Sequence, residues 1–309
     1  MSEVAAPTIV VRPRSRRRRE VLPYLLVAPI CLLMLAITAY PAAQAVYYAM
    51  SNATLLRLAR SRFVWFENFA HLIHDATFLD GIWRTLRWDA AVVGLELALA
   101  LPIALFLNRQ FRGRGFLRTA MMIPYITPPA VVGLLFLYMF NGNFGVANDL
   151  LVRLGILSSS VDWFSDGTLS FVVIVLAMVW SGMPFMALVL LAALQTIPAE
   201  LYEAADMDGA HRWAKFRHIT LPHILPSVLF IVLLRLIWMS NHVDMIYVMT
   251  KGGPGFANYT EAVYSFTLTS QFNISYASAV AVLLAIVLMA LSSLYVRHLA
   301  RTTLAGISR

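Results

Sequence analysis

Six apolar runs dominate the chain, and each is long enough to cross a lipid bilayer as a helix. They lie near residues 22–48, 85–108, 117–140, 170–195, 224–249 and 276–298, and about 20 apolar residues span the hydrocarbon core. A content of 60% hydrophobic and only 13% charged residues exceeds what a soluble core can bury. The sequence therefore predicts an all-α membrane protein with six transmembrane helices.

The basic residues predict the orientation of these helices. Sixteen Lys and Arg lie in the first tail, in or at the edges of alternate loops and around the end of the last run, whereas the opposite loops hold six: Arg57, Arg60, Arg62, Arg84, Arg153 and Lys251. Since short cytoplasmic segments are enriched in Lys and Arg, we expect both termini in the cytoplasm. The net charge of +8 is thus a topological signal and predicts no nucleic-acid partner.

The two ends of the chain are predicted to be cytoplasmic tails. Residues 1–20 hold six arginines and almost nothing to bury, which favours a disordered basic segment; a nuclear or RNA-binding role is the alternative. Residues 300–309 form the second tail. The apolar run after the first tail is long and lacks a small-residue cleavage site, so we interpret it as a retained span rather than a signal peptide.

A polar island, residues 198–222, separates the fourth and fifth runs. Pro198 suits a first helical position, Glu200 and Glu203 lie near the positive helix end, and Gly209 favours a left-handed stop. A second short helix from Ala210 to His218 carries three basic residues and should end at Pro222. The island is predicted to be a helix-turn-helix with halves of opposite charge.

The island contains Glu-Ala-Ala, then three residues and Gly209, and then nine residues and Ile-x-Leu-Pro222. This spacing resembles the EAA loop of permease subunits of ATP-binding-cassette (ABC) importers. In that family the loop is cytoplasmic, and its short coupling helix docks on the nucleotide-binding subunit. The resemblance implies that this contact with the nucleotide-binding subunit is made by Glu203, Ala204, Ala205, Asp206 and Gly209. The alternatives are an ordinary helical hairpin and a DNA-binding helix-turn-helix.

The turn Thr250-Lys-Gly-Gly-Pro-Gly255 resembles the TxGGP element of carbohydrate importer permeases. It extends the resemblance over residues 21–299 and implies the type I ABC importer permease fold in the bacterial inner membrane. A permease of this kind supplies half of a path. The implied partners are a second permease subunit, taken as a paralogue, two ATPase subunits, an extracytoplasmic solute-binding protein and membrane lipid.

The chain is not expected to be an enzyme. It has no G-x-x-x-x-G-K-[ST] phosphate loop, so ATP and magnesium are expected on the partner subunit and no cofactor or metal in this chain. The single cysteine, Cys31, can form no internal disulfide and is interpreted as an apolar filler.

Two polar turns inside the spans are predicted to line the path. In span four, Pro184 frees the carbonyl of Trp180 and Gly182 admits a close neighbour. In span five, positions 235, 238, 241, 242 and 245 share one helical face. A cavity for a sugar is therefore expected from Ser181, Gly182, Phe185, Trp238, Asn241 and His242, although these residues could instead hold a subunit interface together through hydrogen bonds.

The resemblance to the maltose-type permease is incomplete at this cavity. His242 and Met239 stand where that relative has amides, which argues against simple maltose recognition and leaves room for an acidic sugar or a sugar phosphodiester. Arg235 and Asp244 are predicted to pair helices or subunits rather than to contact substrate. Glu96 is treated as the lone charged residue of span two, with a structural role.

Irregular segments are expected in two places. Span three begins Ile-Pro-Tyr-Ile-Thr-Pro-Pro129, which no regular helix tolerates, so freed carbonyls need other partners. The outer loop 51–84 has an amphipathic stretch that resembles the first outer segment of sugar-importer permeases. The second outer loop, 141–169, carries no sign of chemistry.

Two other classes of function are weighed. A stand-alone secondary transporter or channel predicts inverted repeats and coupling-ion carboxylates at mid-membrane, for which Glu96 and Asp244 are thin support. A membrane-embedded enzyme predicts clustered His, Asp or Glu, whereas His242 and Asp244 are expected on different helix faces. Neither class explains the EAA-like loop.

Overall fold

The computed structural model describes the backbone of residues 16–307 and the side chains of residues 23–297 except Ala59. Within this part the chain is helical and has no strand beyond one antiparallel bridge between Ser51 and Phe63. It divides into two units, one through Tyr47 and one from Tyr48 onward. The all-α prediction is confirmed.

The described part of the first unit is helix α1 (Arg16–Ala49), whose last two residues belong to the second unit. The predicted disordered tail, 1–20, overlaps this helix, because residues 16–20 are helical; residues 1–15 lie outside the described part. At the other end, α14 (Ile274–Ile307) includes most of the predicted tail 300–309.

In the described part of the chain, five helices are long and apolar enough to cross a membrane: Pro23–Ala49 of α1, α3 (Ala76–Leu107), α8 (Gly167–Leu194), the continuous stretch Arg212–Ser240, and Ile274–Arg297 of α14. A bent pair, Arg114–Ile126 and Pro129–Met139, is the sixth candidate, with an angle of 89° between its halves. Each of these six segments overlaps one of the six predicted spans, although their bounds differ.

The break in span three lies where the sequence predicts it. Helices α4 (Arg114–Met121) and α5 (Ile123–Ile126) precede it and α6 (Pro129–Met139) follows it. Thr127 and Pro128 are extended, as expected for residues that precede proline. The carbonyl of Ile123 accepts hydrogen bonds from the Thr127 amide and hydroxyl, so the chain itself satisfies this acceptor at the break.

Span five differs from its prediction at both ends. Helix α10 (Arg212–Lys215) passes through a π-helical turn, η2 (Phe216–Thr220), into α11 (Leu221–Ser240), so the expected stop at Pro222 is wrong. The Leu221 amide donates to the Phe216 carbonyl five residues back, and this wider turn tolerates a following proline that has no amide hydrogen. The predicted span 224–249 is also not one helix, because α11 ends at Ser240 and α12 (Asp244–Thr250) follows.

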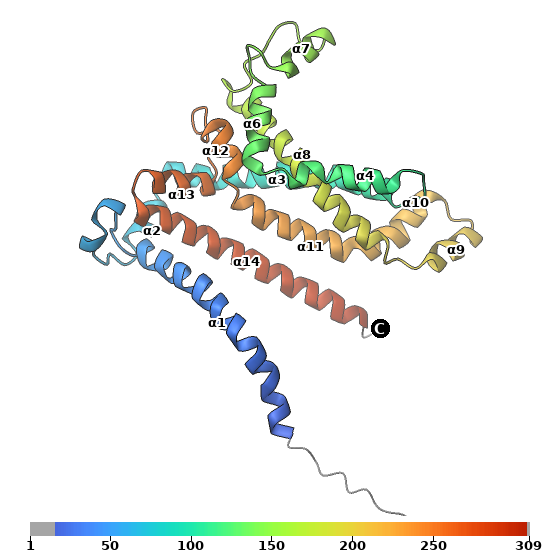
Figure 1. The fold of residues 1–309 in the computed structure, drawn as a ribbon, viewed down its shortest axis with the longest axis horizontal. Coiled ribbons are helices and arrows are strands. Elements are labelled where there is room, and N and C mark those ends of the chain that lie inside the picture. The colour runs from blue at the N-terminus through green and yellow to red at the C-terminus, as the bar shows by residue number, and fades with distance from the viewer. Residues whose placement is uncertain (1–15, 308–309) are drawn as a thin grey trace, which may run out of the picture. The chain divides into compact units, whose positions relative to one another are not determined.

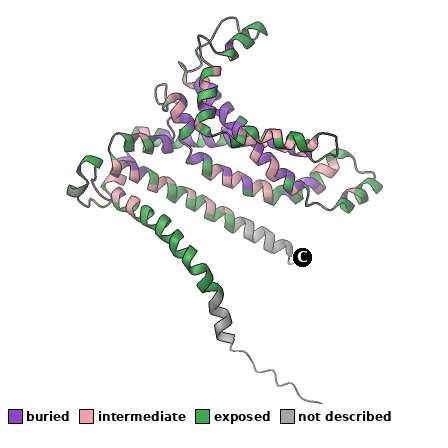
Figure 2. Cartoon of the chain, in the orientation of Figure 1, coloured by how far each residue is buried: buried purple, intermediate pink, exposed green. Residues whose placement is uncertain are grey.

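The second unit is built around α3, α8 and α11, which pack on one another (Figure 1). Figure 2 shows buried residues concentrated along these helices, among them Trp88, Met186 and Ile231. Helix α12 packs on α6, and α13 packs on α14. The remaining elements are η1 (Leu55–Arg60), α2 (Glu67–Leu72), α7 (Val146–Arg153), α9 (Ala199–Met207) and α13 (Glu261–Ser270).

A carboxylate cluster fixes the start of α3 against α13 and α14. Asp75 caps α3 and accepts hydrogen bonds from the hydroxyls of Tyr264 at 2.6 Å and Tyr276 at 3.0 Å. Although burial raises it, the pKa of Asp75 is lowered overall by these hydroxyls and by backbone amides. Nearby Glu261 is buried with both carboxylate oxygens unpartnered, and burial and the charge of Asp75 raise its pKa to about 8.

The loop 141–169 is organised around Asn148, which is 2% exposed. Its amide nitrogen donates to the Val161 carbonyl at 2.9 Å, and its oxygen accepts from the Trp163 indole at 2.9 Å and from the Val161 amide. Because a buried amide has donors and an acceptor to satisfy, this side chain closes the loop on itself.

Candidate functional site

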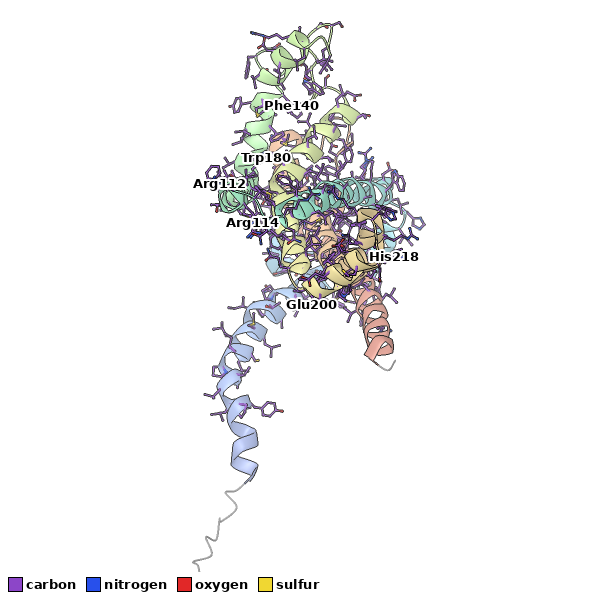
Figure 3. The ribbon with its side chains drawn as sticks, turned by 90° about the vertical axis from the view of Figure 1, so that its right-hand side faces the viewer. Arg112, Arg114, Phe140, Trp180, Glu200 and His218 are labelled. Atoms are coloured by element: carbon purple, nitrogen blue, oxygen red, sulfur yellow. The ribbon has the colours of Figure 1, made fainter. Side chains whose placement is uncertain are left out.

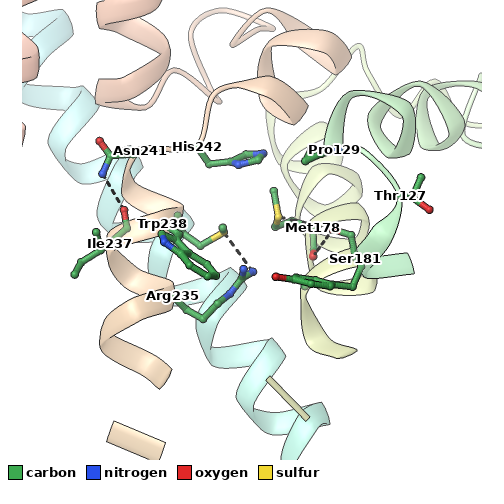
Figure 4. Close-up of a pocket in the computed structure, with 12 residues that line it drawn as sticks. Thr127, Pro129, Met178, Ser181, Arg235, Ile237, Trp238, Asn241 and His242 are labelled. Carbon is green, nitrogen blue, oxygen red and sulfur yellow. Dashed lines mark hydrogen bonds between the residues drawn. The ribbon is translucent and has the colours of Figure 1, made fainter. Parts of the chain in front are cut away.

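A cavity of about 390 Å³ lies where α5, α6, α8 and α11 meet. Figure 4 shows α8 on one side facing the end of α11 on the other. Aromatic, hydroxyl, amide and imidazole groups share the wall with apolar side chains, and the lining residues are Tyr125, Thr127, Pro129, Met178, Ser181, Gly182, Arg235, Ile237, Trp238, Met239, Asn241 and His242. Such a mixture suits a polyhydroxylated ring, which needs both hydrogen bonds and an apolar face.

The α8 wall holds two of the three residues predicted for span four. Ser181 and Gly182 line the cavity, and the Ser181 hydroxyl donates to the Met178 carbonyl at 3.0 Å. Phe185 is not among the lining residues; its ring stacks on Tyr125 at 5.0 Å and lies 5.8 Å from Trp238. Phe185 therefore supports the aromatic wall from behind. Pro184 lies inside an α8 that continues without a break.

The α11 wall holds the three residues predicted for span five. Trp238, Asn241 and His242 all line the cavity. The Asn241 amide donates to the Ile237 carbonyl at 2.8 Å just after the helix ends, as drawn in Figure 4. The His242 ring stacks on Trp88 of α3 at 6.5 Å. Residues predicted from two different spans thus line one cavity, and their role toward a substrate stays a prediction.

The predicted common helical face fails at position 245. Met245 is buried and lies beside Gly133 of α6, away from the cavity lining. The reason is the break after Ser240, which starts a new helix at Asp244 and resets the direction of its side chains. Asp244 itself is exposed.

A buried ion pair borders the cavity through Arg235. The Arg235 guanidinium donates from Nε to Glu96 Oε2 at 2.7 Å and from Nη2 to Glu96 Oε1. Glu96 is 0% and Arg235 4% exposed. Buried charges are tolerated when they are paired, and the predicted helix-pairing role of Arg235 is confirmed for α3 and α11.

Gly182 makes room for this pair. A Cβ atom at this position would overlap with the Glu96 carboxylate and the Arg235 guanidinium. The sequence argument that Gly182 admits a close neighbour is confirmed, and the neighbour is a salt bridge between two other helices. Gly182 therefore both lines the cavity and leaves room for the ion pair.

Sequence reasoning missed a second buried acid in α3. Glu96 is not the lone charged residue of the predicted span two, because Asp89 is 6% exposed and accepts a hydrogen bond from the Ser240 hydroxyl at 2.5 Å. Its position within an apolar run was the available signal. Tyr125 and Thr127 were also missed as lining residues, although they flank the predicted proline break.

A second candidate site is the exposed helix α9, which carries the residues predicted to meet an ATPase subunit. Glu203, Ala204 and Asp206 are exposed, Ala205 is half-buried, and Gly209 has a φ of +72°, which favours glycine. Sequence reasoning missed Met207, whose 89% exposure leaves an apolar side chain available on the same helix.

Two contacts tie α9 to the helix that follows. The Tyr202 and Thr220 hydroxyls lie 2.9 Å apart, and Lys215 Nζ lies 2.5 Å from Asp206 Oδ1. Figure 3 looks onto this end of the second unit and labels Glu200 at the start of α9 and His218 in η2. Helix η2 leads directly into α11, and the far end of α11 lines the cavity. These contacts and one continuous helix therefore connect α9 to the cavity wall.

Comparisons with known proteins agree with this arrangement. Residues 97–304 match the family model described as binding-protein-dependent transport system inner membrane component. The chain is 36% identical over 279 residues to the sulfoquinovosyl glycerol transport system permease protein SmoG of Agrobacterium fabrum, covering 90% of each chain. It is 31% identical over 284 residues to the trehalose/maltose transport system permease protein MalF of Thermococcus litoralis, covering 92% of this chain and 95% of that one.

The fold agrees with solved structures as well. A bacterial ABC transporter that imports the acidic polysaccharide alginate superposes with a TM-score of 0.77 at 22% identity, covering 92% of this chain and 96% of that one. The alginate transporter in complex with its alginate pentasaccharide-bound periplasmic protein gives a TM-score of 0.79 at 21% identity, with coverages of 93% and 96%. The chain has the type I ABC importer permease fold, and it belongs to the family of inner membrane components of binding-protein-dependent transport systems.

Proposed function

We propose that this multi-pass inner membrane permease forms half of the translocation path for a sugar or sugar derivative, together with a second permease subunit. The observation that carries the proposal is the cavity between α8 and α11, with aromatic and hydrogen-bonding groups on facing walls. The names of the relatives, which transport sulfoquinovosyl glycerol or trehalose and maltose, point to the same substrate class.

Energy for transport comes from two ATPase subunits, which bind ATP and magnesium and dock on α9. The exposed Glu203, Asp206 and Met207 offer those subunits two charges and an apolar contact. Closure of the ATPase pair moves α9, and Tyr202, Lys215 and the continuous η2–α11 helix pass the motion to the cavity wall. The cavity then opens outward to a substrate-loaded binding protein, and hydrolysis resets it.

The cavity chemistry favours a substrate without net charge. The Arg235 guanidinium is committed to Glu96, so its charge is largely offset. Trp238 and Tyr125 provide ring faces, while Ser181 and Asn241 provide polar groups. An acidic sugar is the second candidate, because Arg235 and His242 both border the same space.

Uptake by the reconstituted importer tests the cavity. Asn241→Ala and His242→Ala should lower sugar uptake about tenfold each while the subunits still co-purify, since each removes a polar group from the lining. The matched controls Asn143→Ala and His71→Ala change the same residue types at exposed positions of the outer loops. Loss of assembly with unchanged solute preference in the remaining uptake would support a subunit interface instead.

Co-purification tests the docking role. Glu203→Ala and Gly209→Pro should leave the permease in the membrane and lower the amount of ATPase subunit retained, whereas Glu67→Ala, an exposed acid on α2, should not. Unchanged retention and uptake in both variants would exclude the docking role. Transport in vesicles that follows a proton gradient rather than ATP would favour the stand-alone transporter.

A further inference from the structure

A second, open cleft of about 790 Å³ lies beside the α9 helix and is separate from the sugar cavity. Its rim carries three cations, Arg109 after α3 and Arg212 and Lys215 of α10, and it also includes Trp213, Phe216 and Leu105. No acid is among the residues that line it. Asp206 offsets Lys215 from outside, so the two arginines keep their charge available.

The cleft lies at the end of two apolar spans. Leu105 belongs to the last turn of α3, and Arg212 is the first residue of the stretch Arg212–Ser240. Trp213 is 63% exposed, and its ring stacks on Phe216 at 5.4 Å. Exposed tryptophan beside arginine at the end of a span is typical of the depth of lipid headgroups.

The backbone beneath the cleft is itself irregular. Phe216 and Thr220, the two ends of the π-helical turn η2, both line it. Turns of this kind are rare in proteins, and those that occur often lie at functional sites. The turn places the aromatic ring of Phe216 and the hydroxyl of Thr220 on the same cleft.

We propose that this cleft binds the phosphodiester headgroup of an anionic membrane phospholipid. Basic pockets beside membrane helices on the cytoplasmic side hold such headgroups, and this end carries the Arg-rich loops that the proposed topology places in the cytoplasm. Arg109 and Arg212 pair with the phosphate, Trp213 lies at the glycerol level, and Leu105 meets the start of an acyl chain.

The same cleft is connected to α9. Lys215 lines the cleft and pairs with Asp206, while Thr220 lines it and bonds Tyr202. A bound headgroup thus competes with Asp206 for Lys215 and contacts the turn that leads into α11. This part of the inference rests on the proposed coupling function, whereas lipid binding itself does not.

The test is lipid retention by the purified importer complex, measured by native mass spectrometry with phosphatidylglycerol and, separately, phosphatidylcholine. Each basic residue near an anionic surface contributes about fivefold in affinity, so the double variant Arg109→Gln/Arg212→Gln should lower phosphatidylglycerol affinity roughly 25-fold. The matched control Arg112→Gln/Arg114→Gln, at positions labelled in Figure 3, removes one exposed and one half-buried arginine. Neither of them lines the cleft, so this variant should change the affinity less than about twofold.

Three results would overturn the proposal. Equal losses of phosphatidylglycerol affinity in the two double variants would mean that the lipid responds to diffuse surface charge. No loss of affinity in either variant would mean that the cleft is not a lipid site. Displacement of the lipid by millimolar glycerol phosphate would mean that the cleft binds a soluble anion. Trp213→Leu provides a charge-neutral second variant, which should weaken retention severalfold without altering the salt dependence of binding. Because retention needs no transport, its outcome is distinguishable from failure of the permease function.

Discussion

Removal of one partner from the Glu96–Arg235 pair should destabilise the protein strongly. The pair joins α3 to α11 at 0% and 4% exposure, so Glu96→Gln leaves an uncompensated guanidinium in the membrane interior. Breaking a buried pair in this way costs about 3–5 kcal/mol. At roughly 2 °C per kcal/mol or more for a chain of this size, the midpoint of thermal unfolding should fall by about 6 °C or more.

The double variant Glu96→Gln/Arg235→Gln separates the charge effect from packing. It leaves two neutral amides that can bond each other, so we expect it to recover at least half of the loss seen in Glu96→Gln. Thermal unfolding of the detergent-purified complex at fixed ligand and lipid content compares Glu96→Gln, Arg235→Gln and the double variant, and it gives the coupling energy of the pair. A double variant at least as unstable as both single variants together, or single variants that match the wild type, would refute the argument from buried charge.

Gly182→Ala should lower stability by about 1–3 kcal/mol through overpacking against the ion pair. Gly94→Ala in α3, where an added Cβ meets nothing within 4 Å, should be neutral or stabilising by up to about 1 kcal/mol. The midpoints of thermal unfolding compare the two variants, and equal effects would contradict the close approach at Gly182. Glu261 is buried with a pKa raised to about 8 from an ordinary 4.5, so the folded chain holds a proton that the unfolded chain releases, and stability should fall as pH rises from about 5 to 8. Glu261→Gln should flatten that fall, and an unchanged pH profile would count against this reasoning. The charge of Asp75 also raises the Glu261 pKa, and that of Arg84 lowers it. Asn148→Ala should cost about 1–3 kcal/mol by leaving the Val161 and Trp163 partners unpaired, seen as faster proteolysis within 141–167, and cleavage at the wild-type rate would exclude this role.

The linear pattern of the sequence determined the number of spans, the break at Thr127–Pro128 and the short helix α9. Each of these depends on neighbours along the chain: an apolar run of sufficient length, a proline without an amide hydrogen, or a glycine at positive φ. The EAA-like spacing likewise lies within one continuous segment, so it could be read without any tertiary information.

Other features of the backbone depend on which of two local conformations the chain adopts, and the sequence pattern alone did not predict this choice. Pro222 is a helix stop in an ordinary α-helix but is accommodated after the π-turn η2. Asn241 ends α11 although its surroundings are apolar enough to continue the span, which is why Met245 left the predicted face. The periodicity of a helix predicts a shared face only while the helix continues.

Only the tertiary structure decided which buried polar groups meet. Glu96 and Arg235 are 139 residues apart, and Asp89 and Ser240 are 151 apart. Hydropathy indicates that a charge in a span must face other protein or water, but it does not say which helix supplies the partner. That choice follows from how α3, α8 and α11 pack, and Gly182 lets the pair fit between them.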